Sequence, residues 1–89
     1  MATVRLDGML REFIPRRSVE ASAPTVGALI DELEARYPKI RWRLRDETGT
    51  IRRFVKVFVN GEEVGGPQAQ ATPLQASDEV DILHSIAGG

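Results

Sequence analysis

One stretch of the sequence can form a long amphipathic helix, and it lies between two prolines. Apolar side chains recur along it with the 3.6-residue period of an α-helix, at Val26, Leu29, Ile30, Leu33 and Tyr37. Thr25 is a suitable N-cap, because its hydroxyl can accept a hydrogen bond from an amide of the first turn. Pro38 ends the helix, since its ring disfavours helical geometry at Tyr37 and it has no amide hydrogen. The rest of this 89-residue chain must supply a second layer that buries the apolar stripe.

The remaining patterns are those of β-strands. Apolar and polar residues alternate, as in strands with one buried face, in residues 3–7, 18–22, 54–59 and 79–83. Asn60-Gly61 is the strongest short signal for a hairpin turn, because both residues tolerate positive φ, and residues 62–64 form a short return strand. Residues 65–73 are small and polar and predict a loop, after which Leu74 reaches the core.

Residues 40–45 fit two structures. In a strand, Ile40, Trp42 and Leu44 would share one face. In a short helix begun by Pro38, Ile40 and Leu44 face the core and Trp42 faces solvent. We favour the short helix, because the segment directly follows Tyr37-Pro38.

The order of these elements predicts an α+β fold, with two strands, the main helix, a short helix and three further strands. The helix packs on one face of a mixed sheet of four to five strands, whose first and last strands can lie side by side. By analogy with known folds, this is the ubiquitin-like β-grasp architecture. We expect residues 1–84 to form one β-grasp domain and residues 85–89 to form a flexible tail.

The composition excludes several kinds of site. The chain has no cysteine, which excludes disulfides, thiolate metal sites and a cysteine nucleophile. Its one histidine, His84, cannot form a two-histidine metal site, and we expect no bound metal or cofactor. No apolar run approaches the length of a membrane span, and residues 1–5 enter a strand pattern without a signal-peptide core. We therefore expect a cytoplasmic protein that does not bind membranes.

The formal net charge of −1 conceals an asymmetry. Residues 36–56 contain eight basic and two acidic residues, a net charge of +6, whereas the remainder of the chain has a net charge of −7. A basic segment can meet an acidic partner or nucleic acid, although it is more often a solvated face. Only Trp42 interleaves with these arginines as a stacking candidate, so we do not favour nucleic acid as a partner.

The sequence ends in Ile86-Ala87-Gly88-Gly89. Two glycines leave no Cβ near the Gly89 carboxylate, and glycine adopts backbone conformations closed to other residues, so this tail can enter a narrow active site. The alternative is an ordinary frayed terminus. At an average glycine usage of roughly 7%, chance places two glycines at the end of about 0.5% of chains. The sequence before the tail therefore decides how it is interpreted.

Several short motifs give the chain a resemblance to the MoaD/ThiS family of ubiquitin-like sulfur carriers. In order, they are Pro24-Thr25-Val26, Phe58-Val59-Asn60-Gly61-Glu62, Asp78-Glu79-Val80 and Ile86-Ala87-Gly88-Gly89. The length of residues 40–53 makes the chain most similar to family members that serve cysteine formation and secondary metabolism. His84-Ser85 stands where molybdopterin-type tails usually have prolines, and Ser77-Asp78 stands where the family commonly has Gly-Asp. These two departures weaken a molybdopterin-synthase assignment.

The resemblance implies a carrier that serves other enzymes and has no enzyme activity of its own. An enzyme of the ubiquitin-activating type would use ATP to adenylate the Gly89 carboxylate beside Gly88. Sulfide or a persulfide would then displace AMP and leave a thiocarboxylate, which donates sulfur to an acceptor enzyme such as a cysteine-synthase-like one. In the cysteine branch, a metalloprotease-like hydrolase would release the product from the tail. ATP is then a cosubstrate of the activating enzyme, not a cofactor of this chain.

We expect the partner-binding residues on the outer face of the sheet and along the tail. Phe58 and Leu83, with Phe54 beside them, should lie on the face away from the helix. A patch of apolar residues there would mark a partner-binding surface, whereas scattered apolar residues are normal on any surface. Further candidate contacts precede Gly88, at His84, Ser85, Ile86 and Ala87. For His84, the alternative is an ordinary polar residue at a strand end.

Other functions are compatible with the same features. A protein modifier, joined through Gly89 to lysines of its targets, would begin with the same adenylation step. The small subunit of molybdopterin synthase is another alternative within the family. A more distant alternative is a β-grasp module that binds nucleic acid through residues 36–56.

Overall fold

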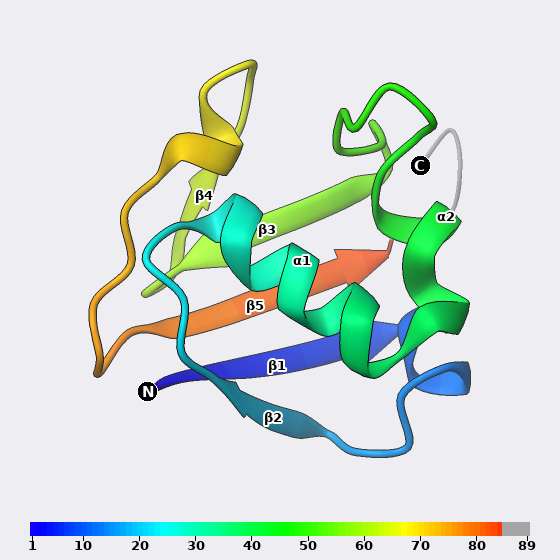
Figure 1. The fold of residues 1–89 in the computed structure, drawn as a ribbon. Coiled ribbons are helices and arrows are strands. Elements are labelled where there is room, and N and C mark those ends of the chain that lie inside the picture. The colour runs from blue at the N-terminus through cyan, green and yellow to red at the C-terminus, as the bar shows by residue number, and fades with distance from the viewer. Residues whose placement is uncertain (85–89) are drawn as a thin grey trace.

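The computed structural model of the protein describes residues 1–84. Its centre is a five-stranded sheet with the order β2-β1-β5-β3-β4. The strands are β1 (Ala2–Gly8), β2 (Ser18–Ala21), β3 (Val55–Val59), β4 (Glu62–Val64) and β5 (Glu79–His84). Helix α1 (Val26–Arg36) crosses one face of this sheet (Figure 1). The short helices of the described range are η1 (Met9–Glu12), η2 (Pro38–Ile40), α2 (Arg41–Leu44) and η3 (Ala69–Ala71).

The first and last strands are neighbours in the middle of the sheet. β1 runs parallel to β5, with Val4 opposite Val80 and Leu6 opposite Ile82. β5 also pairs with β3 in the antiparallel direction, and the β1–β2 and β3–β4 hairpins complete the sheet on either side. The predicted order of elements, the mixed sheet and the side-by-side first and last strands are therefore confirmed.

The apolar core lies between α1 and the inner face of the sheet. Helix α1 buries four of the side chains predicted for its apolar stripe, Val26, Leu29, Ile30 and Leu33. The fifth, Tyr37, follows α1 as its C-cap and is half-buried against the core. Outside α1 and the sheet, the core receives Leu10, Ile14, Ile40, Leu44 and Leu74. The Thr25 hydroxyl accepts a hydrogen bond from the Ala28 amide at 3.2 Å, which confirms the predicted N-cap. The Tyr37 amide donates to the Leu33 carbonyl at 2.8 Å and closes the helix before Pro38.

The segment that fits either a strand or a helix is helical. Pro38 begins η2, where its missing amide hydrogen costs no hydrogen bond. Ile40 and Leu44 are fully buried, whereas Trp42 on α2 is 57% exposed. The preference for a short helix with Trp42 toward solvent is confirmed.

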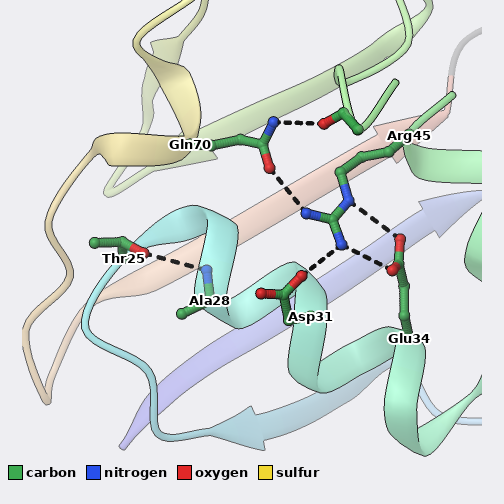
Figure 2. Close-up of polar contacts among 7 residues, drawn as sticks. Thr25, Ala28, Asp31, Glu34, Arg45 and Gln70 are labelled. Atoms are coloured by element: carbon green, nitrogen blue, oxygen red, sulfur yellow. Dashed lines mark hydrogen bonds and ion pairs between the residues drawn. The ribbon is translucent and has the colours of Figure 1, made fainter. Parts of the chain in front are cut away.

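Arg45 fastens the residues after α2 to the main helix (Figure 2). Its guanidinium donates to Asp31 at 2.6 Å and to Glu34 at 2.8 Å. It also donates to Gln70 Oε1 at 2.9 Å, and Gln70 Nε2 donates to the Gly49 carbonyl at 2.8 Å. The Glu34 carboxylate, with Asp31, raises the pKa of Arg45. This network joins α1, η3 and the loop after α2, which are separate in the sequence.

The β3–β4 turn has the predicted residues and is tied to the start of β5. Asn60 and Gly61 have φ values of 51° and 85°, in the left-handed region that these two residue types tolerate. Asn60 exchanges two hydrogen bonds with the Glu79 backbone, of 2.7 Å and 2.9 Å. Its Nδ2 donates to Asp78 at 3.0 Å, and Asp78 also accepts from the Gln75 amide at 2.7 Å. Asp78 therefore joins the turn to the loop before β5.

Truncating Leu33 tests the core. We expect Leu33→Ala to lower the free energy of unfolding by about 2–5 kcal/mol, because it leaves a cavity under α1. Urea denaturation measures the change, and Glu47→Ala, which truncates an exposed loop side chain, should change stability by less than about 0.5 kcal/mol. Equal midpoints for wild type and Leu33→Ala would contradict the assigned packing.

The lowered pKa of Asp78 predicts how the free energy of unfolding changes as the pH falls. Hydrogen bonds from the Gln75 amide and then from Asn60 lower the pKa of Asp78 from its ordinary value of 3.8. The folded-state pKa lies below the unfolded-state one, so the stabilisation is present above about pH 4 and is lost as the pH falls through the folded-state pKa. We expect Asp78→Asn to be less stable at neutral pH and to lose less stability in acid.

Thermal melts between about pH 7 and pH 2 measure this difference. Glu47→Gln removes a carboxylate elsewhere on the surface and is the matched control, which should keep the wild-type acid dependence. The same loss of stability with acid in Asp78→Asn and wild type would contradict the role of the Asp78 carboxylate.

Candidate partner-binding site

β5 leads to the predicted tail, and it is held on both sides. Each residue of β5 lies opposite a residue of β1, and all but Glu79 also lie opposite a residue of β3. His84, the last described residue, is opposite both Gly8 and Val55. Since residue 85 is bonded to His84, the attachment point of the tail is fixed at a central strand. The tail candidates lie outside the described residues; they are Ser85, Ile86, Ala87, Gly88 and Gly89.

Phe58 and Leu83 lie on the face of the sheet away from α1. Both are half-buried, and the strand residues that alternate with them point toward the core. Phe58 is opposite Asp81 and Leu83 is opposite Lys56, so the two apolar residues are diagonal neighbours on adjacent strands. Side chains in this relation are within reach of each other when they are long or aromatic. Their role as partner contacts stays a prediction.

Charged side chains surround this apolar pair. Arg5 Nε lies 2.8 Å from Asp81 Oδ1, and Arg5 Nη2 lies 2.9 Å from Glu79 Oε1. The Asp81 carboxylate, followed by Glu79, raises the pKa of Arg5. Lys56 Nζ lies 3.7 Å from Glu63 on β4. Exposed ion pairs of this kind contribute little to stability, so a partner's charges can replace them at low cost.

His84 and Phe54 belong to the other side of the sheet. His84 alternates with Leu83 and shares the inner side with Ile82, and its ring centroid lies 4.9 Å from that of Phe54 in an edge-on arrangement. The expectation that Phe54 lies beside Phe58 is wrong, because β3 begins one residue after Phe54, which packs against the core. Among residues 1–84, no group forms a hydrogen bond with the buried Nδ1 of His84. The predicted partner contact of His84 stays a prediction.

A groove that the sequence does not predict lies beside β3 and β4. It has a volume of about 640 Å³, and its apolar lining includes Ile51, Val57, Val64 and Pro67. These residues come from separate segments, and the Arg45–Gln70–Gly49 hydrogen bonds join the loops that flank it. Periodicity within one segment cannot reveal such a site.

Two further features are absent from residues 1–84. This range contains no group of three or more histidine, aspartate and glutamate side chains placed to hold a metal ion. None of its helices is long and apolar enough to cross a membrane.

Both the sequence and the fold of this chain are similar to those of known proteins. The sequence model of the ThiS family matches residues 4–89. The sulfur carrier protein CysO of Mycobacterium tuberculosis is 43% identical over 76 residues, which cover 83% of this chain and 82% of that protein. Small archaeal modifier protein 3 of Haloferax volcanii is 32% identical over 89 residues, which cover 97% of this chain and 96% of that protein.

The fold also matches that of solved structures. A chain of the Amycolatopsis orientalis BexX/CysO complex superposes on this one with a TM-score of 0.87 and 34% identity, over 100% of both chains. The prediction of a ubiquitin-like β-grasp fold is confirmed by this match and by the sheet order.

Proposed function

Because this chain belongs to the ThiS family, we propose that it is a sulfur carrier whose Gly89 carboxylate is converted to a thiocarboxylate. The observation that carries this proposal is the 43% identity to a sulfur carrier protein over 83% of the chain. The chain then acts as a protein substrate of partner enzymes. Cysteine formation or a secondary-metabolite pathway is the branch that we favour, since CysO is among its relatives.

The proposed chemistry is acyl transfer at Gly89. A carboxylate oxygen attacks the α-phosphorus of ATP in the activating enzyme, and pyrophosphate leaves. Sulfide then attacks the acyl carbon of the adenylate, and AMP leaves to give the thiocarboxylate. The activating enzyme supplies the hydrogen-bond donors and cations that stabilise the developing charge. The thiocarboxylate sulfur is the nucleophile that reaches the acceptor substrate.

The contribution of this chain is to present the reacting group. β5 pairs on both sides up to His84, which fixes the residue to which the segment 85–89 is bonded. Gly88 and Gly89 add no side chain near the reacting carbon. The chain has no cysteine whose thiol could attack the adenylate. These features suit a substrate that enters the active site of another protein.

The proposed partner contacts are Phe58 and Leu83, with His84 and the residues that follow it. The similarity to a chain in the BexX/CysO complex supports a function exercised in contact with a second protein. A modifier function is the second candidate, and the similarity to small archaeal modifier protein 3 favours it. Both candidates begin with activation of Gly89 and differ in the acceptor.

Mass spectrometry after incubation with the activating enzyme, ATP and sulfide tests the proposal. The intact protein should show one oxygen replaced by sulfur, located at Gly89. Deleting Gly89, or adding one residue after it, should abolish the modification, because a displacement of about 1 Å at a reacting group can cost roughly a hundredfold in rate. Gly88→Val should be nearly as damaging through its bulk.

Thermal melts are the control in this experiment. All these changes lie after β5, so each variant should melt at the same temperature as wild type. Sulfur uptake by the lengthened variant, or none by wild type with any candidate activating enzyme, would contradict the carrier function. Isopeptide-linked conjugates of Gly89 with lysines of other proteins, without sulfur transfer, would establish the modifier function instead.

Charged substitutions test the outer face. Phe58→Asp and Leu83→Asp each place a carboxylate in the proposed contact and should slow activation by at least about tenfold, as expected when a central interface residue is lost. Melting temperatures should stay close to wild type, because both side chains lie outside the core. Thr3→Asp, on the outer face at the other end of β1, is the matched control. Wild-type activation rates in both Phe58→Asp and Leu83→Asp would remove this face from the interface.

A further inference from the structure

Basic residues gather at the end of the molecule where β5 ends. Since His84 is opposite Gly8 and Val55, β1 and β5 both finish at this end of the sheet, and β3 starts there. Two segments adjoin the strands at this end of the sheet, and together they contain nine of the twelve basic residues and three of the thirteen acidic ones. They are residues 9–17 and 37–54. Their net charge is +6, and that of the rest of the chain is −7. In the view of Figure 1, α2 lies toward the same end of the molecule as the ends of β1 and β5.

Some of these cations serve the fold. Arg45 is held by Asp31 and Glu34, and Arg52 Nε donates to the Trp42 carbonyl at 2.7 Å. The remaining cations of η2 and α2 are exposed and flank an exposed tryptophan. We call this group the Trp42 surface; it consists of Lys39, Arg41, Trp42 and Arg43.

The geometry of the Trp42 surface suits carboxylates. The Arg41 guanidinium lies 5.6 Å from the centroid of the Trp42 ring, and that of Arg43 lies 4.8 Å from the centroid of Phe13. A guanidinium stacked on a ring keeps its in-plane N–H groups available, in a fork that matches a carboxylate. The ion pairs within residues 1–84 involve neither Arg41 nor Arg43. Tryptophan and arginine are also the residues most enriched among energetically important interface contacts.

We propose that the Trp42 surface docks on a carboxylate-rich surface of the enzyme that activates Gly89. This inference rests on the proposed carrier function, because it takes the enzyme that receives the tail as the partner. An enzyme that takes in residues 85–89 has to approach the end of the sheet at which β5 finishes with His84. Helix α2, which carries Arg41, Trp42 and Arg43, lies toward that end of the molecule in Figure 1, and Leu83 lies on the outer face one residue before His84. The partner therefore meets the two surfaces on either side of the tail's attachment point.

The charge distribution favours a protein over nucleic acid as the partner. The described domain is 32 Å long, whereas the Debye length at an ionic strength of 0.1 M is about 10 Å. A local acidic surface therefore experiences mainly the cations of the Trp42 surface, which are unpaired within residues 1–84, and the acidic residues at the far end of the domain contribute little. A long polyanion would also pass the acidic remainder, and a single exposed tryptophan offers only one base-stacking position.

Equilibrium binding between the full-length chain and the ubiquitin-activating-type enzyme of the same organism tests the proposal. Arg41→Gln/Arg43→Gln removes two positive charges from the Trp42 surface. Gln75→Glu/Ala76→Glu makes the same change in net charge on exposed loop residues that precede β5, at the opposite end of the sheet. Thermal melts confirm that both variants are folded. Trp42→Ala tests the aromatic contact without a change in charge.

At about 50 mM salt, Arg41→Gln/Arg43→Gln should bind the enzyme about tenfold more weakly than wild type, and the control variant should stay within about twofold. At about 500 mM salt the difference should nearly vanish, because exposed charges are then screened. Trp42→Ala should weaken binding at both salt concentrations. A saturating concentration of enzyme should restore wild-type sulfur uptake at Gly89 in each variant, because the contact affects docking and not chemistry.

Unchanged affinity in Arg41→Gln/Arg43→Gln, an equal loss in the control variant, or no binding of wild type to the enzyme would overturn the proposal. Tighter binding of wild type to an oligothymidylate of about 20 nucleotides, lost in Arg41→Gln/Arg43→Gln, would overturn it in favour of nucleic acid. Binding that depends on the Trp42 surface, without any sulfur uptake at Gly89, would instead contradict only the carrier function.

Discussion

The parallel pairing of β1 with β5 is the contact on which the rest of the structure depends. It places Val4 beside Val80 and Leu6 beside Ile82, and these four buried side chains form the floor on which α1 packs. The same pairing puts β5 between β1 and β3, so the strand before the tail has hydrogen-bonded neighbours on both sides. A terminal segment at a sheet edge would fray more readily. The fixed position of His84 follows from this arrangement.

Local signals in the sequence predict the elements well. The stripe from Val26 to Leu33, the Thr25 cap and the Asn60-Gly61 turn depend on residues close together in the chain, and each was confirmed. Strand alternation also predicts that Phe58 and Leu83 share the outer face. It fails for Phe54, because a sequence pattern does not mark the residue at which a strand begins, and side chains alternate only within it.

Contacts between distant segments are the part that the sequence does not predict. Charge counting finds the basic residues 36–56, but it cannot tell that Arg45 is held by α1 whereas Arg41 and Arg43 are exposed. The register of β1 and β5 is needed to show that residues 9–17 lie at the same basic end of the molecule. For the candidate site, the sequence therefore predicts the chemistry of the tail and the apolar residues of the outer face. The fold adds which charged side chains lie near them and which of these are exposed.

The central place of β5 has a consequence for biosynthesis. The ribosome delivers β1 first, yet its parallel partner is complete only when His84 has left the exit tunnel. Pairing between such distant segments forms slowly compared with local contacts. An incomplete chain that lacks β5 therefore has no central strand and no finished core. The domain can therefore fold only after almost all of its residues have been synthesised, because the strand that completes its core is the last one of the sheet along the chain.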